Sequence, residues 1–251
     1  MNVPAQLFGL KLLGGSGPWA PALEPAPSVR RGPRGGAATG SIELVVLGAS
    51  AGGPPAIESL LRDLGKELAV PLVIAQHMPA TFTRSFAQRL DACLPQRVRE
   101  AGHLEELQAG VVYIAPGDRD LRVERHCGRL RAVLAAPAAA ALYRPSVDLL
   151  FTSAGDATRG NLLAVLLTGM GTDGAVGMAQ LAGDGVHTIA QDCATSAIFG
   201  MPRAAIMAGG AVDVLPLPLI GARLRLLLAA PPALRAPRPP VRWREAMEIS
   251  R

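Results

Sequence analysis

The sequence predicts an α/β protein with three layers, in which a doubly wound, mostly parallel sheet lies between two layers of helices and carries an antiparallel hairpin insertion. Three runs, at 42–47, 70–75 and 161–167, are apolar almost throughout, as is typical of parallel strands that are buried on both faces. Segments with the apolar spacing of helices follow such runs. Two alternating runs that flank Cys127 and Gly128 indicate the hairpin.

The composition is that of a globular chain with one core. Of the 251 residues, 49% are hydrophobic and only 4% are aromatic, so Val, Leu, Ile and Ala must form most of that core. Much of the net charge of +5 comes from arginines near the two ends of the chain. The central region is therefore close to neutral, and we expect no nucleic-acid partner.

The cysteines and the apolar runs exclude further classes of protein. The three cysteines are scattered, and neither Cys-x-x-Cys nor paired histidines at ligand spacing occur. We therefore expect no disulfide framework, no metal and no cofactor. No apolar run reaches the roughly 18 residues that a membrane-spanning helix needs. We expect a cytoplasmic protein without stable membrane insertion.

Composition also divides the chain. Residues 1–40 contain fourteen Gly or Pro and no sustained periodicity, so burial cannot offset the entropy of ordering them, and we expect a flexible leader. The predicted domain covers residues 41–229. Residues 230–251 are rich in Pro and Arg, which predicts a disordered tail.

The first predicted strand ends in a turn of small residues. The segment Gly48–Gly52 fits the pattern Gly-x-Ser-x-Gly, whose glycines allow the sharp backbone turn that exposes a serine hydroxyl. A helix with apolar spacing follows at 57–64, so Ser50 is expected between strand and helix. Its hydroxyl could act as a nucleophile, with amides of the first helical turn stabilising an oxyanion. Equally, such a turn is common in proteins that only bind nucleotides.

The second predicted strand, 70–75, is followed by His77, which thus occupies the same kind of position as Ser50. A lone histidine at such a position is more often structural than catalytic. Whether His77 is catalytic depends on which side chains contact its ring. The elements expected next are a helix at 81–94, a short extended stretch at Val98, a solvated loop at 103–107, a strand at 111–115, and the hairpin at 121–134 with His126 exposed near its turn.

The segment Arg144–Asp148 opens a helix, with Pro145 or Ser146 as the start signal. After the strand at 161–167, glycines surround Asp173. This aspartate either belongs to a site or merely caps the next helix, 175–181. Short strands at 188–190 and 212–215, a polar loop at 191–196, a helical segment at 202–208 and a last helix at 217–228 complete the domain.

Three chemically complementary side chains are thus expected at one edge of the sheet. Ser50, His77 and Asp173 each follow the carboxyl end of an apolar strand, and in an open parallel sheet these ends meet where ligands bind. An imidazole can remove the hydroxyl proton, and a carboxylate can fix the tautomer of the imidazole. The order Ser, His, Asp differs from that of α/β-hydrolases, so another framework would reach the same geometry.

Several motifs in the right order resemble the CheB family, the chemotaxis protein-glutamate methylesterases. The blocks that carry the resemblance are Gly48–Gly53, Gln76–Pro79 with Phe82-Thr83, Tyr113–Asp118, Arg144–Asp148, Leu167–Gly174 and Phe199–Pro202. The resemblance covers roughly residues 42–225. It implies a triad of Ser50, His77 and Asp173, with Met170 at the oxyanion site and Ala51 beside the nucleophile.

The resemblance also implies a substrate and partners. The expected activity is hydrolysis of glutamyl γ-methyl esters on the cytoplasmic helices of chemoreceptors, often with deamidation of receptor glutamines. A nucleotide-binding domain or a catalytically weak signalling module is the alternative. Family members typically carry an amino-terminal receiver domain, and about 40 residues of leader cannot hold one. A separate response regulator is therefore a candidate partner.

The sequence departs from the family pattern at three positions near the expected cleft. Ala51 stands where threonine is frequent, Cys193 where an acidic residue is frequent, and Asp120 where histidine is frequent. We therefore expect differences in the rim of the cleft.

Overall fold

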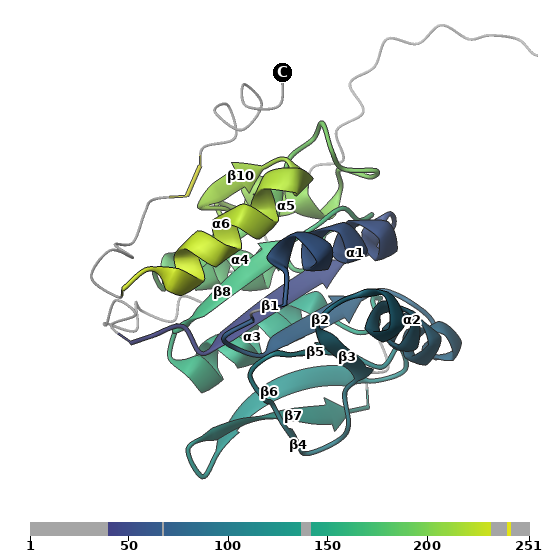
Figure 1. The fold of residues 1–251 in the computed structure, drawn as a ribbon. Coiled ribbons are helices and arrows are strands. Elements are labelled where there is room, and N and C mark those ends of the chain that lie inside the picture. The colour runs from purple at the N-terminus through teal and green to yellow at the C-terminus, as the bar shows by residue number, and fades with distance from the viewer. Residues whose placement is uncertain (1–39, 67, 137–141, 232–239, 242–251) are drawn as a thin grey trace, which may run out of the picture. The chain divides into compact units, whose positions relative to one another are not determined.

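The structure is a computed structural model that describes residues 40–66, 68–136, 142–231 and 240–241 (Figure 1). The strands are β1 (Leu44–Ala49), β2 (Leu72–Gln76), β3 (Arg97–Glu100), β4 (Glu105–Glu106), β5 (Val111–Ile114), β6 (Asp120–His126), β7 (Arg129–Ala135), β8 (Leu162–Leu166), β9 (His187–Gln191) and β10 (Asp213–Leu215). The helices are α1 (Gly53–Leu64), α2 (Ala80–Cys93), α3 (Val147–Thr158), α4 (Ala175–Gly183), α5 (Met201–Met207) and α6 (Leu217–Ala229).

The larger sheet has the order β10-β9-β8-β1-β2-β5-β3, and every pair of neighbours in it is parallel. The chain starts in the middle at β1, moves outward through β2 on one side, and returns to β8 on the other side. A parallel sheet binds ligands at such a reversal, beyond the carboxyl ends of its strands. The segments that follow β1, β2 and β8 therefore share one edge (Figure 1).

The central strand is apolar at both faces because helices cover both. Val45 and Leu47 belong to the part of the core that α1, α2 and α6 cover, whereas Leu44 and Val46 belong to the part that α3, α4 and α5 cover. All four side chains have no solvent exposure. The predicted three-layer, doubly wound fold is thus confirmed, and the uninterrupted apolar runs are explained by burial on both sides.

The hairpin insertion is confirmed, but it is part of a three-stranded sheet within the described residues. β6 and β7 pair antiparallel around Cys127 and Gly128, whose φ angles of 48° and 81° make the tight turn. The solvated loop predicted at 103–107 is confirmed only in part: His103 and Leu104 form an exposed turn, but Glu105 and Glu106 form β4, which pairs with the open edge of β7. The side chains of β4 are both carboxylates, so no apolar pattern indicated a strand there. His126 is exposed, as predicted.

Little of the two predicted terminal segments falls on described residues. Within the tail, the N–H of Val241 donates to the carbonyl of Ala211 at 2.7 Å, and its side chain packs against the core. Of the leader, only Gly40 is described, and its N–H donates to the Asn161 side chain at 3.1 Å. Residues 1–39, 232–239 and 242–251 lie outside the described ranges. None of the helices in those ranges is long and apolar enough to cross a membrane.

Candidate active site

The sheet edge that carries the predicted site opens into a cavity of about 740 Å³. Ser50 directly follows β1, and His77 directly follows β2. Both line the cavity, together with Met78, Pro79, Gly117, Leu142, Tyr143, Arg144, Met170 and Gly171. Asp173 lies between β8 and α4 and is only 4% exposed. The structure therefore gathers the three predicted residues, with the carboxylate buried and the other two at the cavity wall.

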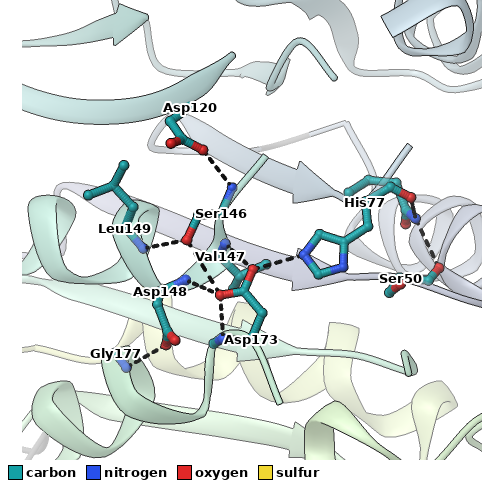
Figure 2. Close-up of polar contacts among 11 residues, drawn as sticks. Ser50, His77, Asp120, Ser146, Val147, Asp148, Leu149, Asp173 and Gly177 are labelled. Carbon is teal, nitrogen blue, oxygen red and sulfur yellow. Dashed lines mark hydrogen bonds and ion pairs between the residues drawn. The ribbon is translucent and has the colours of Figure 1, made fainter. Parts of the chain in front are cut away.

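His77 and Asp173 form a direct hydrogen bond, in which the imidazole Nε2 lies 2.9 Å from the Asp173 carboxylate (Figure 2). An ionised carboxylate can only accept, so Nε2 must carry the proton and donate it. The neutral ring then presents the lone pair of Nδ1 as a proton acceptor. In Figure 2 the second ring nitrogen is turned to the side on which Ser50 lies. This arrangement leaves Nδ1 free to serve as a general base.

The Asp173 carboxylate is held by the beginning of helix α3. It accepts hydrogen bonds from the backbone N–H groups of Val147 at 2.7 Å, Asp148 at 3.0 Å and Gly174 at 3.0 Å (Figure 2). Burial alone would raise the pKa of Asp173, but hydrogen bonds from His77 and from these N–H groups outweigh burial and lower the pKa. The carboxylate thus stays ionised and fixed in place.

The alternative prediction, that Asp173 only caps the following helix, is wrong. Gly174 is the N-cap residue of α4, and that helix end has no side-chain cap. Asp173 instead binds the amino end of α3, a helix distant in sequence, where the helix dipole favours a negative charge. The residue therefore joins the loop after β8 to the segment that opens α3.

The turn that carries Ser50 is held by its backbone on both sides. The Ser50 N–H donates to the carbonyl of Thr168 at 3.0 Å, and the Ser50 carbonyl accepts from the Gln76 side chain at 2.9 Å. Gly52 has a φ of 78°, which favours glycine and permits the predicted sharp turn. The Ser50 hydroxyl makes no hydrogen bond within the described residues, and therefore none to the imidazole. Such contacts are often longer before substrate binds.

Two backbone N–H groups beside Ser50 remain available for an oxyanion. Within the described residues, neither Ala51 nor Met170 has a partner for its N–H. The carbonyls of the same two peptide groups are fixed, since Ser50 O accepts from Gln76, and Gly169 O accepts from the N–H groups at the start of α5. In a planar trans peptide, the N–H points away from the carbonyl. Fixing each carbonyl therefore fixes the direction of each free donor.

The prediction that amides of the first helical turn stabilise the oxyanion was wrong. Pro54 and Pro55 occupy that turn in α1, and proline has no N–H. The N–H of Gly53 is already bound to the Ser50 carbonyl at 2.8 Å. The first turn of α1 therefore also offers no free N–H to a phosphate.

Sequence reasoning missed two residues of the site. Gln76 is 1% exposed, and its side-chain N–H₂ donates to the carbonyls of both Ser50 and His77. Tyr143 stacks on the His77 ring. A polar residue that closes an otherwise apolar strand was a usable signal for Gln76, because a buried amide needs partners. No comparable signal marked Tyr143.

The positions at which the sequence departs from the family pattern have different surroundings. Asp120 is buried, and its carboxylate accepts from the Ser146 N–H at 2.9 Å, so it holds the segment before α3 (Figure 2). Ala51 is exposed at the turn, and Cys193 is half-buried in the loop after β9. Within the described ranges, no three His, Cys, Asp or Glu side chains are grouped so that they could hold a metal ion.

Comparison with known proteins finds relatives of one family. The family model for CheB methylesterase matches residues 45–224. A protein-glutamate methylesterase/protein-glutamine glutaminase of Anaeromyxobacter dehalogenans is 46% identical over 197 residues, which are 78% of this chain and 55% of that protein. An enzyme of the same name from Cupriavidus pinatubonensis is 46% identical over 74% of this chain and 52% of its own length.

A solved structure is also similar to this chain. The CheB methylesterase catalytic domain of Thermotoga maritima superposes with a TM-score of 0.71 at 38% identity, over 74% of this chain and 98% of that domain. The chain spans about half the length of the curated relatives it matches. The match to the family model covers most of the described residues, including the three strand ends of the site, and the chain therefore belongs to the CheB methylesterase family.

Proposed function

We propose that this chain is a serine hydrolase that removes methyl esters from the γ-carboxyls of glutamates in methyl-accepting chemoreceptors. The names of its relatives support this activity and add a second, the hydrolysis of glutamine side-chain amides. The observation that carries the proposal is the hydrogen bond between His77 Nε2 and the buried Asp173, which leaves Nδ1 as a proton acceptor on the side of the ring where Ser50 lies (Figure 2). Receptor helices in the cytoplasm are the substrate that we infer. A response-regulator partner stays a prediction.

The proposed reaction begins with a rotation of the Ser50 hydroxyl toward His77. Nδ1 takes the hydroxyl proton while Oγ attacks the ester carbonyl, and the resulting imidazolium is stabilised by the ionised Asp173. The N–H groups of Ala51 and Met170 donate to the oxyanion of the tetrahedral intermediate. Donors that are already oriented need no reorganisation during the reaction.

Collapse of the intermediate breaks the bond to the methoxy group, which takes the proton from Nδ1 and leaves as methanol. Water then attacks the acyl-serine with His77 again as base, and the products are glutamate and free Ser50. In the amide reaction, ammonia leaves in place of methanol. Both reactions thus use the same three side chains.

Methanol release from a methylated receptor fragment tests the proposal. Ser50→Ala should abolish methanol release and leave thermal stability nearly unchanged, because the Ser50 hydroxyl makes no hydrogen bond within the described residues and its side chain is only half-buried. Ser85→Ala is a matched control, since Ser85 is an exposed serine on α2 whose hydroxyl bonds only to the Phe82 carbonyl. Methanol release by Ser50→Ala at the wild-type rate would refute the proposal.

A further inference from the structure

The ring of Tyr143 covers one face of the His77 imidazole. The two ring centroids lie 5.1 Å apart, and the ring planes differ by only 11°. This is an offset parallel stack, an arrangement that aromatic pairs prefer. Tyr143 is half-buried and lines the same cavity as Ser50 and His77. Its contact with the imidazole therefore lies inside the site itself.

The backbone of Gly171 holds Tyr143 from another direction. A Cβ on Gly171 would lie 2.5 Å from the Tyr143 hydroxyl, so a larger residue at this position would push the tyrosine away. Gly171 also has a φ of 92°, a backbone conformation that residues other than glycine rarely adopt. The tyrosine thus packs against both the imidazole and the loop that supplies Met170.

The same short segment also fixes the carboxylate. Tyr143 stands four residues before Val147, and the N–H groups of Val147 and Asp148 bind Asp173. The segment 143–148 therefore contacts His77 through a ring and Asp173 through backbone donors. A single stretch of chain determines how imidazole and carboxylate face each other.

We propose that Tyr143 is a positioning residue whose ring fixes the plane of the His77 imidazole and closes one of its faces to water. The fixed plane keeps Nε2 on Asp173 while Nδ1 remains turned to Ser50. An aromatic face also attracts a cation, which favours the imidazolium that forms during the reaction. The Tyr143 hydroxyl makes no hydrogen bond within the described residues, so the ring carries this role. The consequence for catalysis rests on the proposed esterase function.

Two substitutions distinguish the effect of the Tyr143 ring on kcat from the effect of its hydroxyl. Tyr143→Phe keeps the ring, and we expect it to retain kcat for methanol release within about twofold. Tyr143→Leu removes the planar surface, and we expect kcat to fall roughly 10- to 100-fold, because small displacements of a catalytic group have effects of that size. Tyr143→Met supplies a longer, flexible side chain that is also not planar, so it should behave as Tyr143→Leu does and provides a second variant if leucine lowers stability.

A spectroscopic readout tests the position of the ring independently of activity. In the full chain, we expect the proton on His77 Nε2 to give a downfield NMR signal that His77→Ala removes. This signal should persist in Tyr143→Phe and should broaden by exchange with water in Tyr143→Leu. Leu226→Ala, which removes an exposed side chain of α6 that does not line the cavity, should leave the signal unchanged.

The outcomes distinguish the two proposals. If the wild-type protein releases no methanol while the signal follows the ring as described, the proposed function fails and the positioning role stands. If Tyr143→Phe loses as much kcat as Tyr143→Leu, the hydroxyl is the active group and the inference is overturned. An unchanged signal and unchanged kcat in both Tyr143→Leu and Tyr143→Met would also overturn it.

Discussion

The backbone N–H of Asp148 donates to the Asp173 carboxylate at 3.0 Å, so two aspartates lie together at the start of helix α3. They differ in their charge state. Asp173 faces His77 and several donors, which lower its pKa. Burial raises the pKa of Asp148 to about 6, and the negative charge of Asp173 adds to this effect. One carboxyl is thus firmly ionised, while its neighbour titrates near neutrality.

This difference predicts a pH-dependent effect on stability. The pKa of Asp148 is higher in the folded protein than the value of 3.8 in an unfolded chain. Its favourable contribution to folding is therefore complete below pH 3.8 and is lost as the pH rises through 6. Asp148→Asn cannot ionise, and its side-chain oxygen can still accept from Gly177. We expect it to raise the free energy of unfolding at pH 8 by roughly 1 to 3 kcal/mol.

Denaturant unfolding at pH 4, 6 and 8 measures this effect. The gain from Asp148→Asn should shrink as the pH falls and should be nearly absent at pH 4. Asp156→Asn, which changes an exposed aspartate on the same helix, serves as the control for the loss of one charge. A gain of the same size at all three pH values would show that ionisation of Asp148 is not the cause.

Asp173→Asn should impair both turnover and stability. The carboxylate oxygens both accept from backbone N–H groups, so either orientation of the asparagine amide brings two donors together. We expect a loss of stability of about 1 to 3 kcal/mol. Control over the imidazole tautomer is also lost, which should lower turnover by up to about 10⁴-fold. Methanol release and thermal unfolding check the two effects, and turnover near the wild-type rate would exclude Asp173 from the triad.

Gln76 is expected to support the geometry of the nucleophile. Gln76→Met removes both donors from the carbonyls of Ser50 and His77 and leaves them without these partners. Stability should fall by about 1 to 3 kcal/mol, and kcat should fall by roughly 10- to 100-fold because the turn that carries Ser50 shifts. The matched control is Gln180→Met on α4, where the glutamine is exposed. Wild-type kcat in Gln76→Met would mean that the turn holds its shape without the amide.

Most of the fold could be predicted because burial on both faces leaves a direct trace in the sequence. The parallel strands contain continuous runs of Val, Leu and Ile, and the helices that cover them keep apolar spacing. The two-residue strand β4 left no such trace, because its pairing depends on the open edge of β7. The two charged residues of β4 show no alternation of polar and apolar side chains, so their pairing with the distant strand β7 could not be predicted from the sequence.

The site could be predicted as positions, but only in part as contacts. Ser50, His77 and Asp173 follow apolar strands, and the topology of the sheet brings these ends together. That Asp173 binds the start of α3 depends on tertiary packing, and so does the stack of Tyr143 on His77. By contrast, the lack of donors at Pro54 and Pro55 was readable from the sequence, since proline has no N–H.

Covalent labelling with a fluorophosphonate, followed by mapping of the adduct by mass spectrometry, shows whether His77 activates Ser50 as the nucleophile. The reagent reports whether a serine hydroxyl is activated by a neighbouring base. We expect one adduct, on Ser50, which is absent in Ser50→Ala and forms much more slowly in His77→Ala. An adduct on another residue, or labelling of Ser50 at the wild-type rate in His77→Ala, would contradict it.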